Sequence, residues 1–126
     1  MKSTRSADGH FPYGGQPDYR NFLMPTELIT QFELHNEINR EIDDPLIVAK
    51  YFNPVWAQTW FMTEYDPDTG VFMGFVTGMP FPEWGSIWIR DFIDLELPFG
   101  MKIERDIHFQ SQPFSEAVPE SERQFG

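Results

Sequence analysis

The sequence contains no cysteine among its 126 residues. This absence excludes disulfide bonds, Cys-ligated zinc sites and thiol catalysis. Basic residues are also few, with 9 Lys and Arg against 20 Asp and Glu, so the formal net charge is −11. Residues 21–110 hold five of the bases and fifteen of the acids, a net charge of −10. A protein that grips a phosphate backbone needs the opposite balance, so we expect no direct binding of nucleic acid.

Long apolar runs are absent as well. No stretch approaches the roughly 20 apolar residues of a membrane-spanning helix, and the N-terminus lacks the apolar core of a secretory signal. We therefore expect a cytoplasmic protein without a membrane partner. The sequence also lacks a GxSxG elbow, an HExxH motif and a Gly-rich phosphate loop, and we predict no cofactor.

Apolar residues are nevertheless sufficient for one folded domain. They make up 40% of the chain, and 14 of the 21 aromatic residues lie between positions 51 and 109. We expect a single domain over residues 23–110. Residues 1–22, rich in Gly and Pro, are predicted to be a flexible lead-in. Residues 111–126 are predicted to be a C-terminal tail that frays after an anchor at Phe114.

The first predicted element is a helix over residues 26–39. Pro25 precedes it, Thr26 is a suitable cap, and Glu27 suits the positive end of the helix dipole. Its apolar residues recur at roughly helical spacing and are predicted to face the core: Leu28, Ile29, Phe32 and Ile38.

Five β-rich segments follow, at residues 46–52, 59–65, 71–77, 84–89 and 102–109, with one or two helical turns at 90–97. Between the second and third segments, Pro67 fixes its φ for a tight turn and Gly70 can adopt the left-handed conformation that closes it. This pattern predicts an antiparallel hairpin. The fold class expected is α+β: a small, mostly antiparallel sheet packed against an N-terminal helix, with flexible termini.

Four groups of residues resemble a known family. They are Lys50, Tyr51, Phe52 and Pro54; then Trp60, Thr63, Glu64, Tyr65 and Asp66; then Phe72, Gly74, Val76 and Gly78; and Ile103, Glu104, Arg105, Asp106 and Phe109. In order and spacing, residues 23–118 are similar to the DUF2958 family, although residues 83–89 depart from its usual pattern. The resemblance implies a small accessory protein of a phage, plasmid or other mobile element. Some relatives carry a label of single-stranded DNA endonuclease.

Arg105 is the first candidate functional residue. In the predicted strand 102–109, alternation places it on the same face as Ile103 and Ile107. An unpaired buried charge costs several kcal/mol, so a guanidinium there needs a carboxylate partner. Glu64 and Asp91 are candidates, and we predict a structural ion pair between Arg105 and Glu64. The alternative is an anion-binding or catalytic arginine.

The opposite face of the same strand carries Glu104, Asp106 and His108. Two of these with Glu64 or Asp66 form a candidate site for a divalent metal ion, and Lys102 or His108 would serve as the basic group beside it. Any solvated strand face shows the same alternation, so no metal site is predicted from it. If the protein is an enzyme, its catalytic residues are expected to be Glu64, Glu104, Arg105, Asp106 and His108.

Two functions from different classes remain. The first is an acidic, non-enzymatic accessory protein that binds a basic, nucleic-acid-handling protein of the host or element, with inhibition as one outcome. The second is a metal-dependent single-stranded DNA endonuclease or related hydrolase. We favour the first, because the charge excess is specific to this chain whereas the catalytic spacing is generic. A homodimer through an edge strand is a third, structural option.

Overall fold

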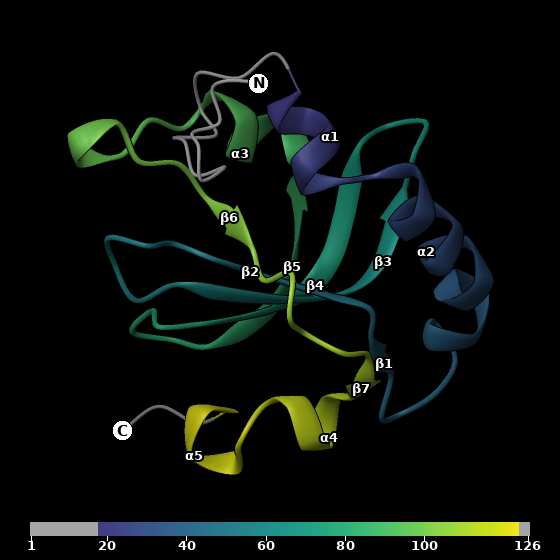
Figure 1. The fold of residues 1–126 in the computed structure, drawn as a ribbon. Coiled ribbons are helices and arrows are strands. Elements are labelled where there is room, and N and C mark those ends of the chain that lie inside the picture. The colour runs from purple at the N-terminus through teal and green to yellow at the C-terminus, as the bar shows by residue number, and fades with distance from the viewer. Residues whose placement is uncertain (1–17, 124–126) are drawn as a thin grey trace.

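The computed structural model describes residues 18–123 and confirms the predicted fold class (Figure 1). Its main sheet has five antiparallel strands in the order β5-β4-β3-β2-β6, and a second sheet pairs β1 with β7. The strands are β1 (Leu46–Ile47), β2 (Ala49–Phe52), β3 (Thr59–Asp66), β4 (Val71–Thr77), β5 (Glu83–Trp88), β6 (Glu104–Arg105) and β7 (Gln112–Pro113). The helices are α1 (Tyr19–Leu23), α2 (Thr26–Asn39), α3 (Ile89–Asp94), α4 (Phe114–Ala117) and α5 (Glu120–Arg123), with a 3-10 turn η2 (Pro98–Gly100).

The β3–β4 hairpin forms where the turn signal predicted it. The N–H of Gly70 donates to the carbonyl of Asp66 at 2.7 Å, and the side chain of Asp66 accepts from the N–H of Asp68 at 2.9 Å. Gly70 has a φ of +75°, the left-handed conformation that glycine adopts without strain. This turn sets the register of β3 and β4, the two central strands of the sheet.

The helix α2 has the predicted bounds, but its apolar residues divide between two faces. Phe32 is fully buried and packs against Tyr65 and Phe72, while Leu28 and Ile29 are half-buried against the same core. The prediction for Ile38 was wrong, because its side chain is 58% exposed. Asn39 occupies the position toward the sheet in its place and is buried.

Helices cover one face of the main sheet, which we call the helix face. There α1, α2 and α3 enclose a core cluster that includes Tyr51, Met62, Phe72 and Phe92. The other face, the tail face, has a smaller cluster of Phe61, Phe75, Ile47 and Val118, closed by the C-terminal segment. Aromatic rings meet edge-on or tilted in both clusters, the geometries that aromatic pairs favour.

The folded region is longer at both ends than the predicted 23–110. The hydroxyl of Tyr19 in α1 donates to the carbonyl of Ile103 at 2.6 Å, and Leu23 is fully buried. At the C-terminal end β7 pairs with β1, Phe114 packs against Phe75, and the chain continues to a fully buried Val118. Residues 19–22 and 111–123 therefore belong to the domain, whereas the rest of the predicted lead-in, residues 1–17, lies outside the described residues.

The predicted strand over residues 102–109 is mostly absent. Only Glu104–Arg105 pairs with β2. Beyond it, the side chain of Asp106 accepts a hydrogen bond from the N–H of His108 at 3.0 Å, which bends the chain into a turn. Ile107 is consequently exposed, contrary to the strict alternation that the sequence suggested. None of the helices described for residues 18–123 is long and apolar enough to span a bilayer.

Candidate functional site

Arg105 is held by main chain and an aromatic ring. Its Nε donates to the carbonyl of Phe22 at 2.8 Å, and its guanidinium lies over the Phe22 ring, 5.4 Å from the centroid. Arg105 also pairs with Tyr51 across β6 and β2. The predicted ion pair of Arg105 with Glu64 is therefore corrected, because the helix α1, which the sequence placed in the lead-in, supplies the partner.

Glu64 instead pairs with Arg40, the C-cap residue of α2. The Arg40 Nε lies 3.1 Å from a carboxylate oxygen of Glu64, and the Arg40 side chain is 63% exposed. Glu64 follows a β-bulge that shifts the register of β3 against β4 between Met62 and Glu64. The bulge turns Glu64 to the tail face, opposite Met73, and places it beside α2.

The other three candidate residues lie at the far side of the sheet. Glu104 is opposite Phe52 in β2, and Phe52 is opposite Thr59 in β3. Glu64 therefore lies two strands away from Glu104 and a further five residues along β3, which is about 15 Å along that strand at the usual rise. Asp106 lies 3.8 Å from the ammonium of Lys50, and His108 is exposed in the turn that follows. Within residues 18–123 no group of three or more His, Asp or Glu side chains is arranged to hold a metal ion. Glu64 therefore lies apart from the other residues named for the endonuclease alternative.

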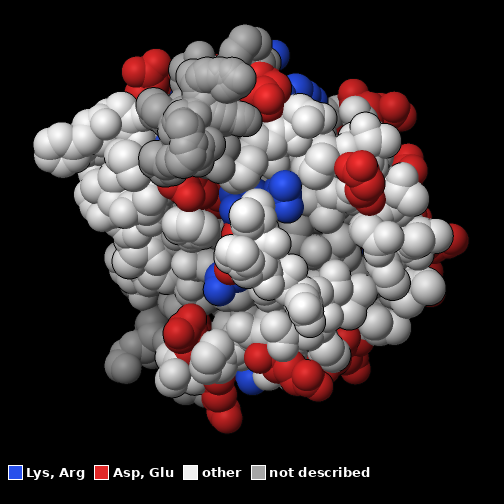
Figure 2. Space-filling model, in the orientation of Figure 1, with Lys and Arg blue, Asp and Glu red and all other residues white. Residues whose placement is uncertain are grey.

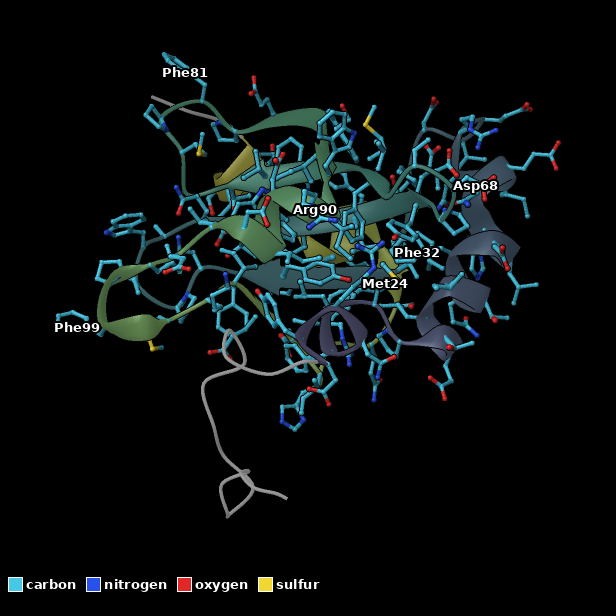
Figure 3. All side chains as sticks on the ribbon, turned by 90° about the horizontal axis from the view of Figure 1, so that it is seen from above. Met24, Phe32, Asp68, Phe81, Arg90 and Phe99 are labelled. Atoms are coloured by element: carbon cyan, nitrogen blue, oxygen red, sulfur yellow. The ribbon has the colours of Figure 1, made fainter. Side chains whose placement is uncertain are left out.

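A groove of about 620 Å³ lies between α2 and the β3–β4 hairpin. Four acidic side chains and one basic side chain line it: Glu33, Glu64, Asp66, Asp68 and Arg40. Asn36, Tyr65 and Met73 contribute to its floor and walls. Asp68 lies beside α2 in the view from above (Figure 3). We call this feature the acidic groove.

Two asparagines of α2 bind the helix to the main chain of β3 and so position the wall of this groove. The Nδ2 of Asn36 donates to the carbonyl of Tyr65, and its Oδ1 accepts from the N–H of the same residue. The Nδ2 of Asn39 donates to the carbonyls of Leu46 and Thr63, and its Oδ1 accepts from the N–H of Leu46. Pairing of β2 with β3 ends at Ala49 and Met62, so these side chains satisfy main-chain groups that no strand reaches.

The outward side of α2, together with the turn that follows its C-cap residue Arg40, carries two rows of side chains. One row is apolar and exposed: Leu34 (62%), Ile38 (58%) and Ile42 (46%). The row beside it consists of Glu33, Glu37 and Glu41, all exposed and all at spacings of four residues. We call these six residues the α2 outer face. No ion pair among the described residues involves its three glutamates.

The α2 outer face is continuous with the acidic groove, since Glu33 belongs to both. Acidic side chains spread along the α2 margin of the molecule, whereas many of the visible Lys and Arg side chains lie nearer the middle of this view (Figure 2). Like charges four residues apart destabilise a helix by about 0.2–0.5 kcal/mol per pair. A cationic partner would remove that cost and cover the exposed apolar row.

Sequence reasoning identified the acidic excess but not this surface. Both four-residue spacings are visible in the sequence, and they were the available signal. Ile38 was grouped with Leu28, Ile29 and Phe32 at a roughly helical spacing, but it follows Phe32 by six residues and so lies about 120° away around the helix. The structural role of the two asparagines had no comparable signal, because it depends on where β2 stops.

Comparison with protein families gives one match. Residues 23–123 match a family model described as "Protein of unknown function (DUF2958)". No curated protein and no solved structure matched the chain significantly.

Proposed function

The chain belongs to the DUF2958 family of unknown function, and from its surface we propose a non-enzymatic protein that binds a basic protein partner. The contact is formed by the α2 outer face and the acidic groove. The partner presents apolar side chains to the row of Leu34, Ile38 and Ile42, and Lys or Arg side chains to the carboxylates beside it. The resemblance to mobile-element proteins favours a partner that handles nucleic acid, whose basic surface this protein would block.

The single observation that carries this proposal is an exposed apolar row on α2 and the turn after it, bordered by three glutamates that form no ion pair with any described residue. Exposed apolar side chains scattered singly are ordinary, but Leu34 and Ile38 lie one turn apart on α2, and Ile42 follows in the next segment at the same spacing. The net charge of −11 directs long-range approach toward cationic surfaces and away from polyanions. Both features select the same class of partner.

The groove adds geometric selectivity to this charge. Its carboxylates come from two elements, α2 and the β3–β4 hairpin, so they surround a side chain that enters between them. Arg40 is already engaged by Glu64, which leaves Glu33, Asp66 and Asp68 available to an incoming cation. An arginine suits this site because its planar guanidinium can bind two carboxylates at once.

The test compares two substitutions of equally exposed isoleucines. Ile38 is 58% exposed in the proposed contact and Ile107 is 59% exposed in the turn after β6. Tagged full-length wild type, Ile38→Ser and Ile107→Ser are used to capture proteins from a bacterial host lysate at low and high salt. Captured proteins are then purified and their affinities for each variant measured by calorimetry.

We expect a basic protein whose binding is weakened about tenfold or more by Ile38→Ser, unchanged by Ile107→Ser, and weakened by salt. Equal affinities for the two variants would show that α2 is not the contact. Capture of acidic partners only, or of none, would contradict the proposal as a whole.

A further inference from the structure

The strand β5 ends the main sheet with an unpaired edge. It pairs with β4 alone among the strands described for residues 18–123. The N–H of Ile89 donates to the carbonyl of Gly70 in the direction of β4, at 2.8 Å. Main-chain groups alternate sides along an antiparallel strand, so those of Trp84, Ser86 and Trp88 point to the free edge. Trp88 is also the N-cap of α3, so its carbonyl accepts the first hydrogen bond of that helix. Among the described residues, five of these main-chain groups are thus available for a further strand.

Few of the usual protections of an edge strand are present here. Natural edges carry lysines, internal prolines or bulges that prevent pairing with another chain. Between residues 83 and 88 there is no Lys, no Pro and no register shift, and the one charged residue is Glu83 at the start. Trp84 and Trp88 both project from the tail face and are 43% and 57% exposed. This edge has the character of a contact surface.

Two tryptophans flank Ser86 symmetrically in β5, with Trp84 two residues before it and Trp88 two residues after it. If two copies pair antiparallel with Ser86 opposite its own equivalent, each Trp84 lies opposite a Trp88 of the other copy. In this register Ser86 exchanges two main-chain hydrogen bonds with its equivalent, and the carbonyl of each Trp84 accepts from the N–H of Trp88 in the other copy. Cross-strand aromatic pairs stabilise such pairing. A two-fold symmetric contact has this reciprocity, because residue i of one copy faces residue j of the other and j faces i.

A hollow on the opposite face fits the same register. A cavity of about 110 Å³ is lined by Trp60, Met62, Val76 and the paired glycines Gly74 and Gly85. A Cβ built at Gly85 would meet no atom within 4 Å, so none of residues 18–123 fills this space. In the Ser86-centred register, Ile87 of a second copy lies opposite Gly85, on the helix face where the hollow opens.

We propose that the protein forms a symmetric homodimer through antiparallel pairing of its β5 strands, centred on Ser86. The five-stranded sheets then join into one sheet of two copies. The two outer edges of that sheet are formed by β6, and both α2 outer faces stay open for the proposed partner. Because each copy carries a charge of −11, salt strengthens the dimer, the opposite of its effect on binding to a basic protein.

The first experiment uses charges at the centre of symmetry. Sedimentation velocity is measured for wild type, Ser86→Lys and Ser86→Glu, with Ser121→Lys, at an exposed position of α5, as the matched control. Like charges directly opposite each other are expected to weaken the dimer about fivefold in each Ser86 variant, and an equimolar mixture of the two should recover a heterodimer. Ser121→Lys should associate like wild type.

The second experiment measures register through cross-linking, which the absence of native cysteine makes unambiguous. In a hydrogen-bonded antiparallel pair the opposed Cα atoms lie about 5.5 Å apart, a separation that a disulfide can span. Mild oxidation should therefore couple Ser86→Cys rapidly and Ser121→Cys slowly. A wild type that remains monomeric at about 1 mM, or equal coupling of the two cysteine variants, would overturn the proposal. Circular dichroism checks that each variant folds.

Discussion

The side-chain amide of Asn36 pairs with the main chain of Tyr65 in the way a neighbouring strand would. Its Nδ2 donates to the Tyr65 carbonyl at 2.9 Å, and its Oδ1 accepts from the Tyr65 N–H at 3.0 Å. One helix turn further on, Asn39 makes three such bonds and is buried. The groove wall therefore depends on two amides that stand in for β-strand pairing beyond the bulge.

These contacts predict unequal effects of two asparagine substitutions. Asn39→Ala leaves a buried carbonyl of Thr63 and two half-buried main-chain groups of Leu46 unpaired, and should lower the free energy of unfolding by about 2–4 kcal/mol. Asn36→Ala should cost about 1–2 kcal/mol because its site is partly open to water, which can replace the lost bonds. Urea denaturation measures both. Asn21→Ala, at an exposed position of α1, is the control and should change stability by less than about 0.5 kcal/mol.

Alanine substitutions at two glycines with positive φ should have different costs, because only one of the two glycines lies against another segment. Gly78 has a φ of +81°, and a Cβ built there lies 2.1 Å from the carbonyl oxygen of Ala57 in the adjoining loop. Gly100 has a φ of +71° and open space around it. Gly100→Ala should cost only the left-handed conformation, about 1–2 kcal/mol. Gly78→Ala should cost about 2–5 kcal/mol, since the two loops must also separate. Equal losses in thermal denaturation would refute the close contact.

The loop contact at Gly78 also orders one end of the molecule. Phe81, four residues from the end of β4, and Phe99 in η2 both project outward at the end opposite to α2 (Figure 3). Phe99 is the most exposed large apolar side chain described and itself has a φ of +65°.

Capping residues, apolar spacing and turn residues are local features of the sequence, and they were sufficient to predict one helix and one hairpin. The helix Thr26–Asn39 and the hairpin of β3 and β4 were predicted from capping, period and turn residues. The strand expected at 102–109 was wrong because the turn that Asp106 nucleates overrode its alternation. The partner of Arg105 was missed for a different reason. It is a carbonyl of Phe22, 83 residues away in sequence, and no local pattern encodes such a contact.

The candidate site was likewise predictable only in part from the sequence. Acidic composition was readable from the sequence, but the position of α2 relative to the sheet was not. Because Asn36 and Asn39 face the sheet, the helix is rotated so that Ile38 points to solvent. A hydrophobic period alone assigns the more apolar side of a helix to the core, and here two polar residues take that side.

Buried tyrosines predict loss of stability at alkaline pH. Burial raises the pKa of Tyr51 well above its usual value, an effect that the charge of Arg105 only partly opposes. The folded protein keeps this proton while the unfolded chain loses it above about pH 10. Stability is therefore complete below that pH and falls above it, by about 1.4 kcal/mol per pH unit for each such tyrosine. Burial raises the pKa of Tyr19 in the same direction.

The substitution Tyr51→Phe tests whether this tyrosine contributes to the loss of stability at alkaline pH. At neutral pH it should cost about 1–2 kcal/mol, because the hydroxyl donates to the Leu23 carbonyl at 2.6 Å and leaves it unpaired when removed. Above pH 10 its stability should fall less steeply than that of wild type, by one tyrosine's contribution. Urea titrations at several pH values between neutral and alkaline measure the slope. Parallel slopes for the two proteins would mean that Tyr51 does not titrate on unfolding.

A substitution of Glu37 should have opposite effects on the stability of the free protein and on its affinity for a basic partner. It lies between Glu33 and Glu41 on the α2 outer face, four residues from each, and makes no ion pair among the described residues. Glu37→Gln removes the repulsion with Glu33 inside α2 and a repulsion with Glu41 in the turn after the helix, and should raise the free energy of unfolding by about 0.2–1 kcal/mol at low ionic strength. Salt should reduce this gain, since the charges are exposed.

The same substitution should weaken binding to a basic partner, because it removes a carboxylate from the contact without disturbing the fold. Glu120→Gln in α5 changes the net charge equally and should affect neither quantity as much. Melting temperatures at low and high salt give the first effect, and calorimetric titration with a captured basic protein gives the second. A residue that destabilises the free molecule yet strengthens its complex is positioned for the complex. If Glu37→Gln leaves stability and affinity unchanged together, the acidic row is only a solvated helix face.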